Sequence, residues 1–452
     1  MSNISAYRAS ILHCLRDPGD DNDSLVSLAS GAVEYFEDGL LLVVDGYVDF
    51  VGPANEMLKT LPSNVQVIDY RNQLIIPGLI DCHVHYPQVD IIASYGERLL
   101  DWLEKYAYPA ERRFVDANYA KEIAEHFVQE LLRNGTTTAC VFATVHPQSV
   151  DAIFEAASDV GMRLISGKVL MDRNCPEDLR DNPRTAYEQS RQLIDKWHGH
   201  GRLSYAVTPR FAITSSEKQL REAGRLLNEY PDVYLHTHLA ENEEEVEQVA
   251  RQFPWSRSYL DVYENFELLR ERSIFAHCIH LNDDDRKQMA NKGAAIAFCP
   301  SSNLFLGSGL FDFHAARQCN VRVGAGSDVG GGTSLSMLRT LGDGYKVLQL
   351  RGEKLTPFGA FYLATLGAAK ALYLDDRIGS FEKGKEADFI VLDPARIDML
   401  QRGGGENAIS NRLFAMFFLG DNRVVREVYL MGQARRPLRQ AELAQRITEL
   451  QQ

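Results

Sequence analysis

Long apolar runs and basic clusters are both missing from this 452-residue chain, and their absence excludes several classes of protein. No uninterrupted apolar stretch approaches the roughly 18 residues that a membrane-spanning helix needs. The first residues, MSNISAYRASILHC, lack a basic segment followed by a long apolar one, so no secretory signal is expected. The formal net charge is −14, which argues against a polyanion as partner. We expect a cytoplasmic protein that acts on a small molecule, with no membrane or nucleic-acid partner.

Cysteines are few and scattered. The seven cysteines are odd in number and never form a C-x-x-C pair, which argues against a disulfide framework and against a cysteine-based zinc knuckle. Hydrophobic residues make up 45% of the chain and charged residues 24%, as in an ordinary globular protein with a full core. The length suits one large α/β barrel with a smaller module.

From about residue 74, short strand-like segments alternate with helical periodicity. Between the first two segments, Tyr119–Arg133 has apolar residues at the spacing of an amphipathic helix, and Asn134-Gly135 is typical of its end. Eight β/α units predict a (β/α)8 TIM-like barrel rather than an open sheet. The eight predicted strands are Leu74–Cys82, Thr136–Phe142, Arg163–Met171, Leu203–Phe211, Val233–Ala240, Ser273–Leu281, Ala294–Cys299 and Arg322–Gly326.

Both ends of the chain have β character of a different kind. Alternating or apolar runs are split by turn residues at Ala32–Phe36, Leu40–Val44, Tyr47–Val51, Ala387–Leu392 and Val424–Leu430. Neither end is long enough for a strong core of its own. We therefore predict one small β-sandwich module formed by residues 1–73 plus 382–452, and a barrel formed by residues 74–381.

Candidate metal ligands stand where the first predicted strand ends. A barrel enzyme places its reacting groups at the C-terminal ends of its strands. The first strand ends in Asp81-Cys82-His83-Val84-His85, and residues two apart in a strand point to the same side. His83 and His85 can therefore face the barrel mouth together, while Cys82 points away. An isolated H-x-H is more often a pair of surface or core histidines than a metal site, so other strands must supply support.

That support comes from strands five, six and eight. His238 and Glu241 follow the fifth strand, His277 lies on the sixth, and Asp328 follows the eighth. Imidazoles or carboxylates thus recur at the same end of four predicted strands, and ordinary surface or core residues explain this recurrence poorly. Three histidines with an aspartate are nitrogen and oxygen ligands that suit zinc, with iron or manganese as substitutes. His236 shares the parity of His238 but lies a layer deeper, which indicates a core or supporting role.

Three segments carry a family resemblance: Pro77–Gln88, Thr208–Ala212 and His236–Asn242. In them the chain resembles the guanine deaminases, which belong to the mononuclear zinc deaminase branch of the amidohydrolase superfamily, and it is most similar to the bacterial type. Leu304–Gly309 and Gly384–Phe389 add to the resemblance, which extends from about residue 30 to 430. The metal motifs alone indicate only the superfamily. Gln88 and the Arg210-Phe211 pair narrow the resemblance to the guanine deaminases.

The resemblance implies hydrolytic deamination of guanine to xanthine and ammonia in purine catabolism, with one Zn²⁺ per chain and a homodimeric assembly. The implied metal ligands are His83, His85, His238 and Asp328. The implied catalytic residues are Glu241 as proton shuttle, Asp328, and His277 beside the reacting water or substrate. The implied purine-binding residues are His85, Gln88, Arg210, Phe211, His238, Glu241 and Asp328.

The sequence is also compatible with other kinds of hydrolase. A binuclear hydrolase of cyclic amides needs a bridging carboxylated lysine, and Lys168 lies in the third predicted strand, although in its middle. A related deaminase or dechlorinase acting on another purine, a pterin or a triazine would share the site chemistry. An inactive scaffold is disfavoured because every expected ligand is present. Trp102 fits either a pocket wall or a buried packing position.

Overall fold

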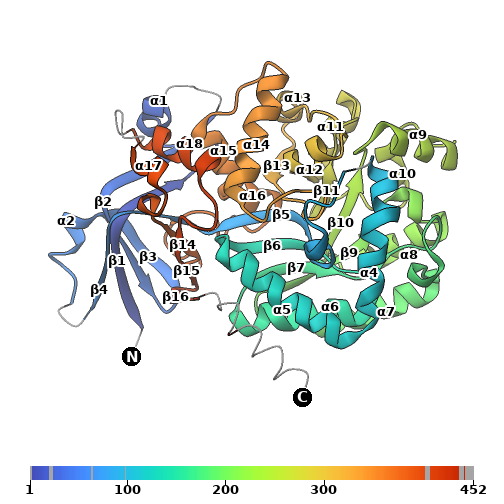
Figure 1. The fold of residues 1–452 in the computed structure, drawn as a ribbon, viewed down its shortest axis with the longest axis horizontal. Coiled ribbons are helices and arrows are strands. Elements are labelled where there is room, and N and C mark those ends of the chain that lie inside the picture. Colours follow the sequence, from blue (N-terminus) through green and yellow to red (C-terminus); the bar gives the residue numbers. More distant parts are fainter. Residues whose placement is uncertain are drawn as a thin grey trace.

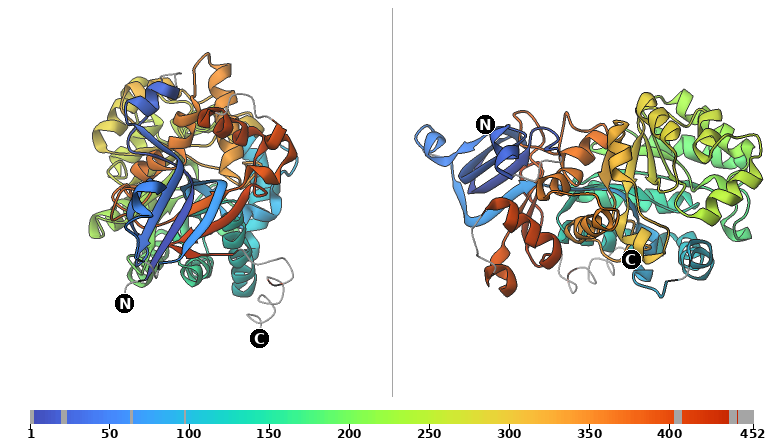
Figure 2. Two further views of the ribbon diagram at one scale, coloured as in Figure 1. Left: turned by 90° about the vertical axis from the view of Figure 1, so that its left-hand side faces the viewer. Right: turned by 90° about the horizontal axis from the view of Figure 1, so that it is seen from above.

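The computed structural model describes residues 3–19, 24–62, 65–96, 98–402, 408–436 and 442. A barrel and a seven-stranded sheet lie side by side within these ranges, as both the front view (Figure 1) and the view from above (Figure 2) show. Residues 437–441 and 443–452, which the sequence analysis assigned to the module, lie outside the described ranges. Throughout those ranges, every helix is too short or too polar to cross a membrane.

Eight parallel strands form the barrel in chain order, which confirms the predicted fold class. The strands are β5 (Leu79–His85), β6 (Thr136–Phe142), β7 (Arg163–Gly167), β9 (Leu203–Pro209), β10 (Tyr234–Leu239), β11 (Ser273–His277), β12 (Ala295–Phe298) and β13 (Arg322–Ala325), with the short β8 (Val169–Leu170) also pairing with β9. The first and last strands meet just beyond β13. There the Asp328 amide donates to the His83 carbonyl at 2.8 Å, and the His85 amide donates to the Val329 carbonyl at 2.7 Å.

Helices follow the barrel strands and cover the outside of the barrel (Figure 1). The predicted helix at Tyr119–Arg133 is confirmed as α5 (Ala117–Arg133), which begins at Asp116 because that side chain accepts a hydrogen bond from the Asn118 amide at 2.8 Å. The other helices of ten residues or more in the barrel region are α6 (Pro147–Val160), α7 (Pro183–Trp197), α8 (Glu217–Glu229), α9 (Glu243–Gln252), α11 (Asp283–Lys292) and α14 (Met337–Leu350).

Both chain ends contribute to the second sheet, whose spatial order is β16-β15-β14-β4-β1-β2-β3. Its strands are β1 (Ile4–Cys14), β2 (Val33–Val44), β3 (Tyr47–Pro53), β4 (Val67–Pro77), β14 (Phe389–Leu392), β15 (Val425–Leu430) and β16 (Gln433–Ala434). The C-terminal strand β14 pairs with β4 and so inserts beside the N-terminal strands. The N-terminal and C-terminal parts of the chain therefore lie in one sheet.

The first predicted barrel strand, Leu74–Cys82, is wrong at its beginning. Leu74–Pro77 belong to β4 of the second sheet, and the barrel strand starts at Leu79. The chain changes sheets at Gly78, where an added Cβ would lie 2.0 Å from the Thr137 hydroxyl. The residues on both sides of Gly78 are apolar and fully buried, so no polar residue marks the boundary in the sequence.

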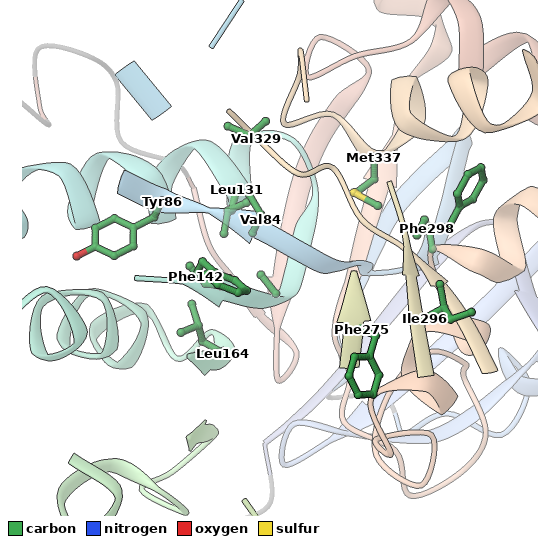
Figure 3. Close-up of a cluster of buried hydrophobic side chains, with 14 of the residues drawn as sticks. Val84, Tyr86, Leu131, Phe142, Leu164, Phe275, Ile296, Phe298, Val329 and Met337 are labelled. Atoms are coloured by element: carbon green, nitrogen blue, oxygen red, sulfur yellow. The ribbon is translucent and has the colours of Figure 1, made fainter. Parts of the chain in front are cut away.

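Apolar packing holds the barrel strands against their helices. Figure 3 shows Val84 of β5, Phe142 of β6 and Leu131 of α5 in one buried cluster. The ring of Phe142 also packs against His85, with centroids 4.6 Å apart. Because a close-packed side chain has little freedom to move, this core fixes the direction of the polar residues at the end of β5.

Buried ion pairs join the barrel to the second sheet. Arg202 precedes β9, and its Nη2 donates to Glu386 Oε2 at 2.6 Å and also to Asp388. Arg163 of β7 donates to Glu386 as well, with its Nε 3.3 Å from Oε2. Glu386 and Asp388 are buried just before β14, so these pairs fix the sheet against the N-terminal end of the barrel strands.

Candidate functional site

Four side chains converge at the C-terminal end of the barrel. They are His83, His85, His238 and Asp328. Each offers one ligand atom, all of these atoms lie within 4.8 Å of one another, and all four residues are buried. Asp328 Oδ1 is 3.1 Å from His83 Nε2 and 3.3 Å from His85 Nε2. The Nε2 atom of His85 lies 3.2 Å from that of His83 and 3.2 Å from that of His238.

Hydrogen bonds on the far side of two imidazoles fix their direction. His238 Nδ1 lies 2.7 Å from the Arg210 carbonyl oxygen. A carbonyl only accepts, so this nitrogen carries the proton and the Nε2 lone pair faces the cluster. His83 Nδ1 lies 2.7 Å from His236 Nε2, a hydrogen bond in which either nitrogen can be the donor. The structure thus places His236 behind a candidate ligand, which agrees with the supporting role expected from its deeper layer in the barrel.

Asp328 is positioned by the first strand. The Asp81 carboxylate accepts hydrogen bonds from the Ser327 amide at 3.0 Å and from the Ser327 hydroxyl. Asp328 itself has a left-handed backbone with φ of 50°, and His277 has φ of 72°. Non-glycine residues with positive φ carry backbone strain, which accumulates at functional sites. The surrounding hydrogen bonds hold these two side chains at the barrel mouth.

The chemistry of this set fits a divalent metal ion. Burial lowers the pKa of His85 to about 4, and burial likewise holds the pKa of His238 well below its usual value. Both rings are therefore neutral and keep a lone pair for a metal. Burial opposes ionisation of Asp328, but the neighbouring imidazoles, His83 first among them, hold its pKa well below the usual range. Three imidazoles and one carboxylate are a common ligand set for a hydrolytic metal.

His277 and Glu241 lie beside the four candidate ligands. His277 Nε2 is 3.4 Å from Glu241 Oε2 and 3.8 Å from Asp328 Oδ2. The Asn303 amide donates to His277 Nδ1 at 2.9 Å, and burial lowers the pKa of His277 to about 3. The ring is therefore neutral with its proton on Nε2, which has no hydrogen-bond partner in the described part of the chain. That N–H is free to donate to a ligand.

Glu241 is held at the start of α9. Asn242 and Glu245 form a capping box, in which the Glu245 carboxylate accepts hydrogen bonds from the amides of Glu241 at 2.8 Å and Asn242 at 3.1 Å. The Ser308 hydroxyl donates to Glu241 Oε1 at 3.1 Å. Burial raises the pKa of Glu241 well above its usual value, and the charges of Asp328 and Glu245 raise it further. This side chain is suited to hold and deliver a proton.

A pocket opens directly onto the candidate metal ligands. It is lined by His85, Gln88, Leu99, Trp102, Leu103, Arg210, Phe211, His238, Glu241, His277, Leu306, Asp328 and Gly331. Every site residue that the sequence analysis named lines this pocket except His83, which belongs to the ligand cluster beneath it. Trp102 is both buried and part of the pocket wall, and within the described ranges its indole N–H has no hydrogen-bond acceptor.

Sequence reasoning missed one residue of this region, Glu111 of α4 (Tyr108–Arg112). Its carboxylate is buried beneath the pocket wall and accepts hydrogen bonds from Arg210 and Gln88. No local pattern identifies it, because α4 is a single short helix in an irregular segment and Arg210 lies far away in the sequence.

The structure disfavours a binuclear site. Lys168, the candidate for a carboxylated bridge, is buried in an ion pair with Asp181, with Nζ 2.6 Å from Oδ2. A second group of possible ligands consists of His277, Cys299 and Asp328. Burial raises the pKa of the Cys299 thiol well above its usual value, and its Sγ lies 3.3 Å from the Ala297 carbonyl, to which it donates. A neutral thiol is a poor metal ligand because the thiolate is the binding form.

An eight-stranded barrel with this cluster at its C-terminal mouth defines the class of barrel hydrolases built around a histidine-rich metal site. The model of the amidohydrolase family matches residues 74–435, and the chain belongs to that family. Guanine deaminase of Escherichia coli K12 is 50% identical over 431 residues, covering 95% of this chain and 97% of that protein. A probable guanine deaminase of Deinococcus radiodurans is 39% identical over 437 residues, covering 95% of this chain and 98% of that protein.

Solved structures agree with these relationships. The structure of the E. coli guanine deaminase superposes with a TM-score of 0.92 at 47% identity and covers 96% of this chain and 100% of that one. A guanine deaminase from C. acetobutylicum with guanine bound in its active site superposes with a TM-score of 0.85 at 27% identity, over 96% of this chain and 100% of that one. Within the amidohydrolase family, this chain therefore belongs with the guanine deaminases.

Proposed function

We propose that this chain hydrolyses guanine to xanthine and ammonia, with one Zn²⁺ bound per chain. One observation carries the proposal: the metal-ligand cluster, a proton-holding carboxyl group and the two purine-binding candidates Gln88 and Arg210 open onto a single pocket. Close similarity to guanine deaminases supports the choice of substrate.

His83, His85, His238 and Asp328 would hold the metal. Bound there, Zn²⁺ would supply an activated water near neutral pH, since it lowers the pKa of water from about 15.7 to about 7. Asp328 is placed to accept a proton from the attacking water, because it lines the pocket and its Oδ2 lies 3.8 Å from His277 Nε2. The carbon attacked is C2 of guanine, which bears the amine.

Glu241 and His277 would manage protons and charge around C2. Glu241 has a raised pKa and so gives a proton to the ring nitrogen next to C2 as the tetrahedral centre forms. Glu241 is then a carboxylate, so it takes the proton of the hydroxyl group on C2 and passes it to the departing amine, which leaves as ammonia. The proton that Asp328 accepted from the water returns to Glu241 and restores both groups. The free N–H of His277 donates a hydrogen bond to the oxygen on which negative charge develops.

Gln88, Arg210 and Phe211 would recognise the purine. An amide offers one donor and one acceptor side by side, and a guanidinium offers forked donors, which together match the alternating edge of guanine. Phe211 is buried at the pocket wall, with its ring 6.4 Å from that of His238. An aromatic ring there packs against the planar substrate and excludes water.

The proposal is tested by ammonia release from guanine, adenine, cytosine and pterin and by ring opening of hydantoin, with the metal content measured on the same sample. We expect guanine to be the best substrate and one zinc per chain. No release from guanine would overturn the substrate, and two metals per chain would favour the binuclear interpretation. A homodimer and a cytoplasmic location remain predictions for sedimentation and fractionation experiments.

A further inference from the structure

Glu111 connects the two polar side chains that the purine would meet. Arg210 Nη1 lies 2.8 Å from both carboxylate oxygens of Glu111, and Gln88 Nε2 lies 3.0 Å from Oε1. All three side chains are almost completely buried. Gln88 and Arg210 line the pocket, whereas Glu111 lies behind them. A carboxylate in this position acts on a ligand only through its two neighbours.

The first consequence concerns the orientation of the Gln88 amide. Its Oε1 accepts a hydrogen bond from the Gly330 amide at 3.2 Å, while its Nε2 donates to Glu111. A backbone N–H only donates and a carboxylate only accepts, so these two partners allow one of the two amide orientations and exclude the flipped one. Gln88 keeps one N–H and one acceptor lone pair for the pocket, each in a fixed place.

The second consequence concerns Arg210. In the described part of the chain, both hydrogen bonds of its guanidinium go to Glu111 through Nη1, which leaves the donors on Nε and Nη2 for a ligand. The tyrosine ring of Tyr108, on the same helix as Glu111, lies 5.3 Å from the Arg210 Cζ atom. Glu111 also cancels the charge of Arg210, so this end of the pocket favours a neutral base over an anion.

We infer that Glu111 is a positioning residue that makes the pocket selective for a 6-oxo purine over a 6-amino purine. This inference rests on the proposed function. A 6-oxo purine has an acceptor at O6 and a donor at N1, which match the free donors of Arg210 and the fixed acceptor of Gln88. A 6-amino purine presents the reverse pattern at both atoms. Without Glu111, only the Gly330 amide at 3.2 Å holds the Gln88 amide in this orientation. The flipped form, which suits a 6-amino purine, then becomes accessible, and the selectivity falls.

The test compares Glu111→Gln and Glu111→Asp with the parent protein in its metal-loaded form. Glu104→Gln is the matched control, because Glu104 is an exposed residue seven positions earlier in the chain. Calorimetry measures binding of hypoxanthine and adenine, which carry the 6-oxo and 6-amino groups but no 2-amine. Kinetics with guanine gives kcat and KM, and metal content and thermal midpoint are measured on each sample.

For Glu111→Gln we expect hypoxanthine binding to weaken by roughly 10- to 100-fold, adenine binding to change by less than about threefold, and KM for guanine to rise more than kcat falls. Glu111→Asp keeps the charge and restores part of the selectivity, and Glu104→Gln behaves as the parent.

Equal losses for hypoxanthine and adenine, unchanged binding of both, or loss of the metal would overturn the inference. If Glu111→Gln does not fold, Glu111→Asp decides by the same comparison: a smaller hypoxanthine preference than the parent supports the inference, and an unchanged ratio overturns it. Failure of the proposed function is separate. A parent protein that prefers hypoxanthine but releases no ammonia from guanine would reject the deaminase assignment and leave the role of Glu111 intact.

Discussion

Replacement of Glu241 by glutamine isolates the proton-transfer role at the site. The new side chain would keep nearly the same volume and could still accept the hydrogen bond that Ser308 donates to Oε1 at 3.1 Å. It could not release or regain a proton. General acid–base catalysis by one positioned side chain is worth about 10²- to 10⁴-fold in rate, or about 3–5 kcal/mol of barrier. We therefore expect kcat for guanine to fall by that factor in Glu241→Gln.

Metal content should be unchanged in this variant, since Glu241 is not one of the four clustered ligands. Glu243→Gln is the matched control: Glu243 is exposed in the first turn of α9 and should have parental activity when changed. The steady-state rate of ammonia release and the metal content are measured on the same preparations of the parent and of both variants. A kcat within tenfold of the parent in Glu241→Gln, with the metal retained, would refute the shuttle role.

Other contacts lead to three further predictions. Arg210→Lys keeps the positive charge but loses the planar fork, so steady-state kinetics should show KM for guanine raised about tenfold with metal content unchanged; an unaltered KM contradicts this. Arg202→Ala leaves Glu386 and Asp388 buried without that partner and should lower the free energy of unfolding by about 3–5 kcal/mol in urea titrations; a loss under about 1 kcal/mol contradicts it. Burial raises the pKa of Glu245 from 4.5 to about 7, so the folded state binds more protons between those values and this residue makes stability fall as pH rises through them. In Glu245→Gln the free energy of unfolding should therefore fall less between pH 5 and pH 7 than in the parent. A larger fall than in the parent would contradict this prediction.

The sequence predicts that the candidate ligands lie close together because two simple rules apply to them. Strand alternation puts His83 and His85 on one side, and a barrel brings the ends of distant strands to one face. His238 and Asp328 therefore come together although they lie on different strands. His236 has the same parity as His238 but lies one layer deeper in the barrel, and its hydrogen bond to His83 explains why a histidine occupies that deeper position.

Other features depend on contacts that no local pattern records. Glu111 lies on a short helix, and only the folded chain brings it to Gln88 and Arg210. The change of sheets at Gly78 is invisible in the sequence because the strands on both sides are buried and apolar. The proton position on His277 likewise depends on Asn303, which comes from another part of the barrel.

Titration of the metal-free protein with Zn²⁺, followed by ammonia release from guanine, tests the central claim most directly. The account predicts that activity is lost with the metal, rises in proportion to bound zinc and reaches its maximum at one zinc per chain. Full activity without metal, or a maximum reached only at two metals per chain, would contradict it.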